Sequence, residues 1–180
     1  GAVDRIHDPL QRGVGIGAGA LLPYEAVLRK SPDDGAMDDA LPTPQVLAEG
    51  RYARFMRRGH WEYVERHACQ GAVAMIAVTP EGRLLLTEQL RLPLGRRVIE
   101  LPAGLIGDHA APGESMEAAA RRELLEETGY DPGRIIPLAY GPPSAGLSSE
   151  LVWLVRAADL VKRGDGGGDP TEAITVHEVP

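Results

Sequence analysis

The sequence predicts an α+β fold built around a mixed β-sheet, and three observations support this. Residues 71–78 form a continuous apolar run, which is typical of a strand buried on both faces. A helix is predicted to open near residues 112–114 and to end at Gly129, because glycine readily adopts the left-handed conformation that ends helices. Strands are predicted on both sides of this helix without strict alternation, which favours a layered α+β fold over a doubly wound one.

Composition narrows the class of protein. A chain of 180 residues suits one domain, and its hydrophobic content of 43% and charged content of 25% are ordinary for globular proteins. The net charge of −7 argues against general binding to nucleic acid or to anionic membranes. No apolar run approaches the ~18 residues that span a bilayer. The single cysteine, Cys69, cannot form an internal disulfide, so we expect a cytoplasmic protein.

Residues 1–48 are predicted to be an N-terminal extension or arm, partly disordered, and residues 49–180 to be the folded domain. Within the domain, alternating or continuous apolar patterns predict strands ahead of the helix. Residues 79–82 have the composition of a turn, so the strands on either side are expected to pair as a hairpin. The strands predicted before the helix are 61–66, 71–78, 83–90 and 97–101.

The chain after the helix is predicted to return to the sheet. A glycine-rich stretch, residues 164–169, is expected to be a mobile loop ahead of the last strand. The strands predicted after the helix are 134–139, 151–156 and 173–176.

The end of the predicted helix carries three carboxylates on one face. Glu123 lies three positions before Glu126 and four before Glu127, and these spacings place all three side chains together. Like charges at such spacings destabilise a helix by a few tenths of a kcal/mol per exposed pair. A solvated acidic surface is one interpretation. The other is a site for a hard divalent cation such as Mg²⁺, which prefers carboxylate oxygens and phosphate.

The string Arg122 to Tyr130 resembles the core of the Nudix box, Arg-Glu-hydrophobic-x-Glu-Glu-x-Gly-hydrophobic. Glu114 lies eight positions before Arg122, which meets the seven-residue gap of the family pattern. Gly104 lies ten positions before Glu114 where the pattern allows six, so we expect an insertion within residues 107–111. The resemblance implies the Nudix fold, an α/β/α sandwich with a mixed sheet.

The resemblance also implies roles for the residues of the box. Glu123, Glu126 and Glu127 would bind two or three Mg²⁺ ions, or Mn²⁺, and the backbone carbonyl of Ala103 would be a further ligand. Arg122 would pair with Glu114. Because Nudix proteins usually continue into a terminal helix, the resemblance allows that the C-terminal end of this chain is cut short.

Other segments resemble the ADP-ribose pyrophosphatase branch of the family, namely Trp61-Glu62-Tyr63-Val64, residues 88–95 and residues 99–105. The branch implies that Trp61 stacks on adenine with Glu62 at the edge of the base. Stacking on a base is worth ~1–3 kcal/mol, and burial in the core is the alternative for Trp61. Arg66 and Arg91 would contact phosphates or adenine, and Leu105 belongs to the same substrate-binding set.

Residues 141–150 resemble the Ser-Pro-Gly-Leu-Ser loop of that branch, with Ala145 in the place of the proline that marks ADP-ribose specificity. Glu150 would face the metals and the substrate. Glu172 aligns with the catalytic carboxylate of the branch, and a base on a mobile loop could activate a water over bound substrate.

These resemblances imply hydrolysis of the diphosphate of a nucleoside-diphosphate sugar, with ADP-ribose giving AMP and ribose 5-phosphate. GDP-mannose, NADH or a dinucleotide are alternative substrates. A non-catalytic nucleotide sensor is an alternative from another class, although such modules typically lose carboxylates that this chain keeps. The branch further implies a homodimer in which the N-terminal strands and the Trp cross to the partner.

Overall fold

The structure, a computed structural model, describes residues 41–107, 113–168 and 172–180. Most of the predicted N-terminal extension therefore lies outside the described residues. Its last part is described, and there Gln45–Glu49 forms strand β1. No helix in the described ranges is both long and apolar enough to cross a membrane.

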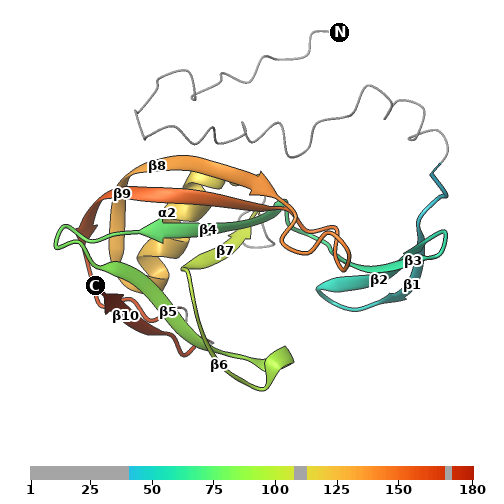
Figure 1. Ribbon diagram of the computed structural model, residues 1–180, viewed down its shortest axis with the longest axis horizontal. Helices are drawn as coiled ribbons and strands as arrows, with labels where there is room; N and C mark the ends of the chain where they lie inside the picture. Colours follow the sequence, from blue (N-terminus) through green and yellow to red (C-terminus); the bar gives the residue numbers. More distant parts are fainter. Residues whose placement is uncertain (1–40, 108–112, 169–171) are drawn as a thin grey trace, which may run out of the picture.

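A four-stranded mixed sheet of order β7-β4-β9-β8 forms the body of the molecule (Figure 1). Its central pair is parallel, with Met75 of β4 opposite Val155 of β9, and its outer pairs are antiparallel. The α+β fold with a mixed β-sheet that the sequence predicts is confirmed. The strands are β4 (Gly71–Ala77), β7 (Ala103–Ile106), β8 (Tyr130–Gly141) and β9 (Val152–Lys162).

The predicted hairpin across residues 79–82 is wrong. The turn forms, since the backbone N–H of Thr79 donates to the carbonyl of Arg83 at 2.8 Å, but only Val78 and Leu84 then pair. The next strand leaves β4 and enters a second, antiparallel sheet of order β10-β5-β6. Its strands are β5 (Leu84–Arg91), β6 (Arg96–Glu100) and β10 (Thr175–Val179), with a short 3₁₀ turn, η3 (Leu92–Leu94), between β5 and β6.

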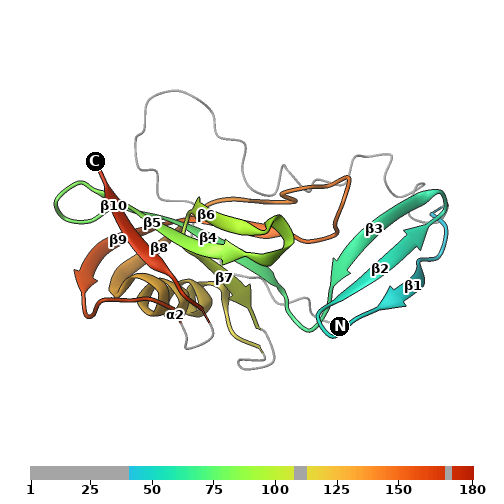
Figure 2. The same cartoon turned by 90° about the horizontal axis from the view of Figure 1, so that it is seen from below.

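A third sheet, of order β1-β2-β3, stands apart from the body (Figures 1 and 2). It contains β1, β2 (Ala53–Arg58) and β3 (Trp61–Arg66). The segment after β8 joins this sheet to the body, because the N–H of Val64 donates to the carbonyl of Leu147 and the N–H of Ser149 donates to that of Val64.

The predicted helix is α2 (Met116–Thr128), which starts later than the expected 112–114. Ser115 caps it, since its side chain accepts a hydrogen bond from the N–H of Ala118, and such a cap fixes where a helix begins. Gly129 ends it at φ 76°. Among the described residues α2 is the one α-helix, so they show a single helical layer where the resemblance implies two.

The core lies where α2 meets β4, β5 and β9. Ala119, Ala120 and Leu124 form the apolar face of α2 and are fully buried. Glu127 lies on this buried side as well and is only 2% exposed. Burial of a carboxylate beside an apolar core costs free energy unless something compensates its charge. The burial of Glu127 therefore indicates that the functional site borders the core at this position.

Candidate active site

A cavity of about 480 Å³ opens beside the carboxylate-bearing end of α2. This volume is within the range of small-molecule sites. The cavity brings together residues from β3, β4, β5, β7, α2 and the segments before β9 and β10. Its lining residues are Arg66, Ala72, Arg91, Ala103, Gly104, Leu105, Arg122, Glu123, Glu126, Glu150 and Glu172.

Glu127 lies behind the cavity wall, where its carboxylate accepts a hydrogen bond of 3.1 Å from the backbone N–H of Ala103. Burial raises the pKa of Glu127 to about 8, and the charges of Glu123 and Glu172 add to the increase. The Ala103 hydrogen bond and the charge of Arg91 act in the opposite direction. The ionised form of Glu127 is therefore not fully compensated by the positive charge around it.

Glu123 has a similar electrostatic environment. Burial raises its pKa, Arg122 opposes the increase, and Glu126 and Glu172 reinforce it. Room for its carboxylate depends on Gly104, because a Cβ at that position would come within 1.9 Å of the Glu123 carboxyl carbon. A glycine at the start of β7 thus keeps space for an acidic side chain beside the backbone of Ala103.

Arg122 connects the acidic residues of the site. Its guanidinium donates to both carboxylate oxygens of Glu114 at 3.0 Å, which is the pairing that the resemblance implies. It also lies 2.9 Å from Glu123 and 3.4 Å from Glu126, and donates to the carbonyl of Leu105. Glu114 and Glu123 raise the pKa of Arg122, chiefly through the hydrogen bond to Glu114, and burial opposes the increase. Arg122 fixes α2 to β7 and partly neutralises the cluster.

The acidic residues fit a divalent cation by chemistry. Within the described parts of the chain, no three Asp, Glu, His or Cys side chains converge into a ready-made metal cage. Glu123 and Glu126 instead contact Arg122, and Glu127 contacts Ala103. The raised pKa values of Glu123 and Glu127 nevertheless identify carboxylates that additional positive charge would stabilise, and Mg²⁺ prefers such oxygen donors.

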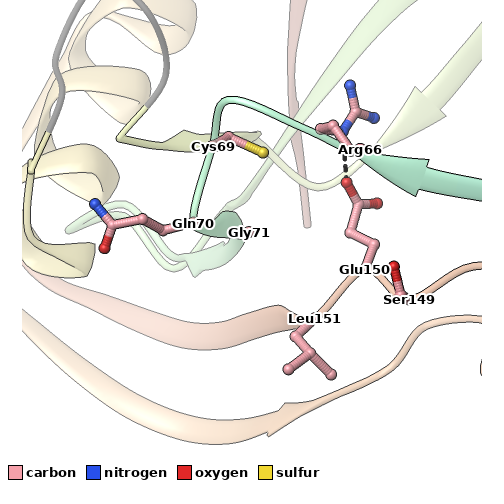
Figure 3. A pocket seen from close by; sticks show the side chains of 7 residues that line it. All are labelled: Arg66, Cys69, Gln70, Gly71, Ser149, Glu150 and Leu151. Atoms are coloured by element: carbon pink, nitrogen blue, oxygen red, sulfur yellow. Dashed lines mark hydrogen bonds and ion pairs between the residues drawn. The ribbon is translucent and has the colours of Figure 1, made fainter. Parts of the chain in front are cut away.

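Two predicted substrate-binding arginines also reach the cavity. Arg66, at the end of β3, donates to Glu150 at 2.6 Å, and Figure 3 shows the two side chains facing each other from different segments. These two side chains also line a smaller cavity of about 120 Å³, together with Cys69 and Gln70. Arg91, the last residue of β5, also lines the carboxylate cavity of about 480 Å³.

The predicted adenine-binding residues lie elsewhere in this chain. Trp61 is 52% exposed, which excludes the core as its location, and its indole N–H donates to the carbonyl of Gly146 at 3.2 Å. It lines a separate cavity of about 560 Å³ beside β3, and Glu62 is exposed on the same strand. Neither residue lines the carboxylate cavity of its own chain.

The glycine-rich stretch before Glu172 is attached to α2 by hydrogen bonds, whereas the sequence predicts a mobile loop. The N–H groups of Gly167 and Gly168 donate to the carbonyls of Glu127 and Glu126 at 2.9 and 3.0 Å. A Cβ at Gly168 would lie 2.6 Å from a carboxylate oxygen of Glu172. The end of the helix therefore holds Gly168 in place, and Gly168 lies against the side chain of Glu172.

Sequence reasoning missed two features of this site. The predicted strands before the helix stop at residue 101, whereas Ala103–Ile106 forms a further strand, β7, that pairs with β4. Glu100 was also missed, although it accepts a hydrogen bond from Arg91 at 2.7 Å. The alternation of side chains along 96–100 could have placed Glu100 on the inner face, but pairing with Arg91 depends on the register of two strands.

A family model for the NUDIX domain matches residues 70–177. The chain belongs to the Nudix family. The matched region includes every residue that lines the carboxylate cavity except Arg66, and it begins after the β1-β2-β3 sheet.

Two relatives illustrate the range of Nudix proteins that this chain resembles. It is 40% identical over 90 residues to an ADP-ribose pyrophosphatase of Bacillus subtilis, covering 50% of this chain and 46% of that one. It is 36% identical over 110 residues to a methanol dehydrogenase activator of Bacillus methanolicus, covering 61% and 57%. The chain thus spans about half the length of these relatives.

A solved structure supports the fold. The crystal structure of an ADP compounds hydrolase matches with a TM-score of 0.59 over 78% of this chain and 77% of that one, at 22% identity. At this identity the match supports the Nudix fold alone.

Proposed function

We propose that this Nudix protein hydrolyses the diphosphate linkage of a nucleoside-diphosphate sugar, with ADP-ribose as substrate and AMP and ribose 5-phosphate as products. The observation that carries the proposal is a single cavity in which the acidic face of α2 lies beside Arg66 and Arg91. An anion with two phosphates needs positive charge around it, and arginine offers bidentate contacts to phosphate oxygens.

The cofactor that we propose is Mg²⁺, or Mn²⁺ in its place, as two or three ions. Glu123, Glu126 and Glu127 would hold it, with the carbonyl of Ala103 as a further ligand. Divalent cations supply Lewis-acid chemistry, because they make water more acidic and neutralise charge on a leaving phosphate.

The residues of the chain then have separate tasks. Arg66 and Arg91 bind and orient the diphosphate, and Arg122 keeps α2 and β7 in register. Glu172 accepts the proton of the attacking water. The water oxygen forms a bond to phosphorus as the anhydride P–O bond breaks, so that each product leaves with one phosphate.

We also propose that the protein acts as a homodimer in which the β1-β2-β3 sheet of one chain reaches the site of the other. This is supported by the position of Trp61, exposed and outside the cavity of its own chain. Apolar side chains on the projecting sheet give further support, since Val46 and Phe55 are exposed as well. Trp61 of the partner would then be available to stack on adenine.

One observation favours a second substrate. Ala145 replaces the proline that marks ADP-ribose specificity in the branch that the sequence resembles, and it lies beside Trp61 in the 560 Å³ cavity. GDP-mannose, NADH and dinucleotides are therefore the alternatives. A nucleotide sensor without activity is disfavoured, because all four acidic residues of the box, including Glu114, are present.

The test is Mg²⁺-dependent hydrolysis of ADP-ribose, GDP-mannose, NADH and diadenosine polyphosphates, with products separated by chromatography. We expect AMP to be released selectively from ADP-ribose. Preference for another substrate would overturn the proposed specificity for ADP-ribose but would leave the proposed hydrolysis of a diphosphate linkage in place. No turnover of any compound, with nucleotide binding intact, would contradict the enzymatic proposal and favour the sensor.

A further inference from the structure

Arg91 and Glu100 form an ion pair at the edge of the cavity. The Nε of Arg91 donates to a carboxylate oxygen of Glu100 at 2.7 Å, across neighbouring strands β5 and β6. Glu100 lies opposite Thr87 in the register, and Thr87 is fully buried, so the pair lies on the inner face of this sheet. Only Arg91 of the two lines the cavity.

Several carboxylates near Arg91 compete with a bound phosphate for its guanidinium. The same cavity contains the carboxylates of Glu123, Glu126, Glu150 and Glu172. A long, flexible guanidinium among four carboxylates would be drawn onto them, where it would occupy the oxygens that a cation needs. Glu100, which does not line the cavity, accepts a hydrogen bond from the Nε of Arg91. This bond restricts the orientation of the planar guanidinium without using its two terminal nitrogens.

We propose that Glu100 is a positioning residue that holds Arg91 away from the acidic residues of α2 and presents it to the diphosphate of the substrate. The inference rests on the proposed function, because it assigns Arg91 to phosphate binding. It assigns a role to a residue that itself does not line the cavity.

The same two strands contain a matched control. Arg97 of β6 donates through its Nε to Glu88 of β5, also at 2.7 Å. The exposed fractions of the side chains are nearly equal in the two pairs, 42% and 27% for Arg91 and Glu100 against 42% and 24% for Arg97 and Glu88. Glu88 lies opposite Ile99, one residue out of step with Thr87 and Glu100, so this second pair is on the outer face.

The experiment compares Glu100→Gln with Glu88→Gln in the full chain. Both variants remove one carboxylate charge and preserve side-chain shape. Glu88 also lies 2.8 Å from the Nε2 of His177 in β10, so Glu88→Gln removes more contacts within the sheet than Glu100→Gln does, and a rise in KM confined to Glu100→Gln is not explained by lost sheet contacts. We expect Glu100→Gln to raise KM for the substrate about tenfold with little change in kcat, because Arg91 is used for binding. Glu88→Gln should leave KM within about twofold of the wild type. Thermal unfolding of each variant identifies any loss of folded protein.

A double variant provides a second readout. If Glu100 acts through Arg91, then Glu100→Gln should have no further effect on KM in an Arg91→Ala background. Equal KM values for Glu100→Gln and Glu88→Gln, or additive effects in the double variant, would overturn the proposal.

Binding of ADP in the presence of Mg²⁺, measured by calorimetry, separates this proposal from the proposed function. Weaker binding of ADP to Glu100→Gln than to Glu88→Gln supports the role of Glu100 even if the wild type hydrolyses none of the substrates. Equal binding to both variants overturns that role even if the wild type is an active hydrolase.

Discussion

Glu127 shows how one side chain can belong to both the core and the active site. It follows Leu124 by nearly one helical turn, so the packing of α2 carries it to a position where it is 2% exposed. Among the described residues, the backbone group that donates a hydrogen bond to it is the N–H of Ala103. The fold thus holds a carboxylate in a place that disfavours its charge, which is the arrangement expected of a cation ligand.

The raised pKa of Glu127 predicts a pH dependence of stability in metal-free protein. The ordinary pKa is 4.5 and the folded-state pKa is about 8. Between these values the folded state keeps a proton that the unfolded state has lost, so this group makes the free energy of unfolding decrease as pH rises through the window. The midpoint of thermal unfolding should therefore fall less steeply with pH in Glu127→Gln than in the wild type.

Mg²⁺ should act in the opposite direction, since it binds the deprotonated carboxylate. We expect the stabilisation of the wild type by Mg²⁺ to be larger above pH about 8 than well below it. Parallel pH profiles for the wild type and Glu127→Gln would show that Glu127 titrates normally.

At the residue level, the spacing of the carboxylates on α2 could be predicted because helical geometry is local. Glu123, Glu126 and their neighbour Arg122 are within a single helix, and the cavity contains all three. Glu100 could not be predicted in the same way. Its partner, Arg91, is nine positions away, and their contact depends on the register of β5 with β6.

At the level of elements, the sequence locates strands better than it locates their partners. The apolar run of β4 predicts a buried strand, and the turn after it forms, but β5 pairs with β6 and β10 and not with β4. Strand β8 (Tyr130–Gly141) is longer than the predicted strand 134–139 and runs through Pro132. Strand β8 is at the edge of its sheet and has a neighbour on one side only. A proline, which lacks an N–H group, is therefore tolerated in it.

The glycine loop gives a prediction about an element that supports Glu172. Gly168 and Gly82 have almost the same backbone conformation, with φ of 79° and 80°. A Cβ at Gly168 would collide with Glu172, whereas a Cβ at Gly82 has nothing within 4 Å. Gly168→Ala and Gly82→Ala should each lose about 1–2 kcal/mol of stability from the left-handed conformation, and only Gly168→Ala should also lose kcat, by about tenfold or more.

Steady-state kinetics and thermal unfolding of these two alanine variants check the prediction. If both variants keep the wild-type kcat, the position of Glu172 next to Gly168 is unimportant for the reaction.

At the level of the whole molecule, Trp61 lies apart from the carboxylate cavity of its own chain. The homodimer that the resemblance implies would bring Trp61 of one chain to the cavity of the other. The β1-β2-β3 sheet projects from the body and contacts it through the segment after β8 (Figure 2). A dimer that shares its sites predicts complementation between two inactive chains. Trp61→Ala should lose binding worth about 1–3 kcal/mol, and Glu127→Gln should lose turnover.

Co-expression of these two variants provides the measurement. In a mixed dimer, the site of the Trp61→Ala chain keeps its carboxylates and receives an intact Trp61 of the partner subunit, so one site of two is restored. We expect the mixed preparation to bind substrate as the wild type does at that site. If the mixture is no more active than the average of the two separate variants, Trp61 acts within its own chain or has no role.

The most direct test of the central claim is Mg²⁺-dependent release of AMP from ADP-ribose by Glu127→Gln and by Glu117→Gln. Both residues are glutamates of α2, but Glu117 is exposed in the first turn. Losing about 3–4 kcal/mol of charge stabilisation corresponds to a rate loss of about 100- to 1,000-fold, which we expect for Glu127→Gln. Glu117→Gln should retain the wild-type rate. Near-normal release of AMP by Glu127→Gln would contradict the assignment of the acidic face of α2 as the catalytic metal site.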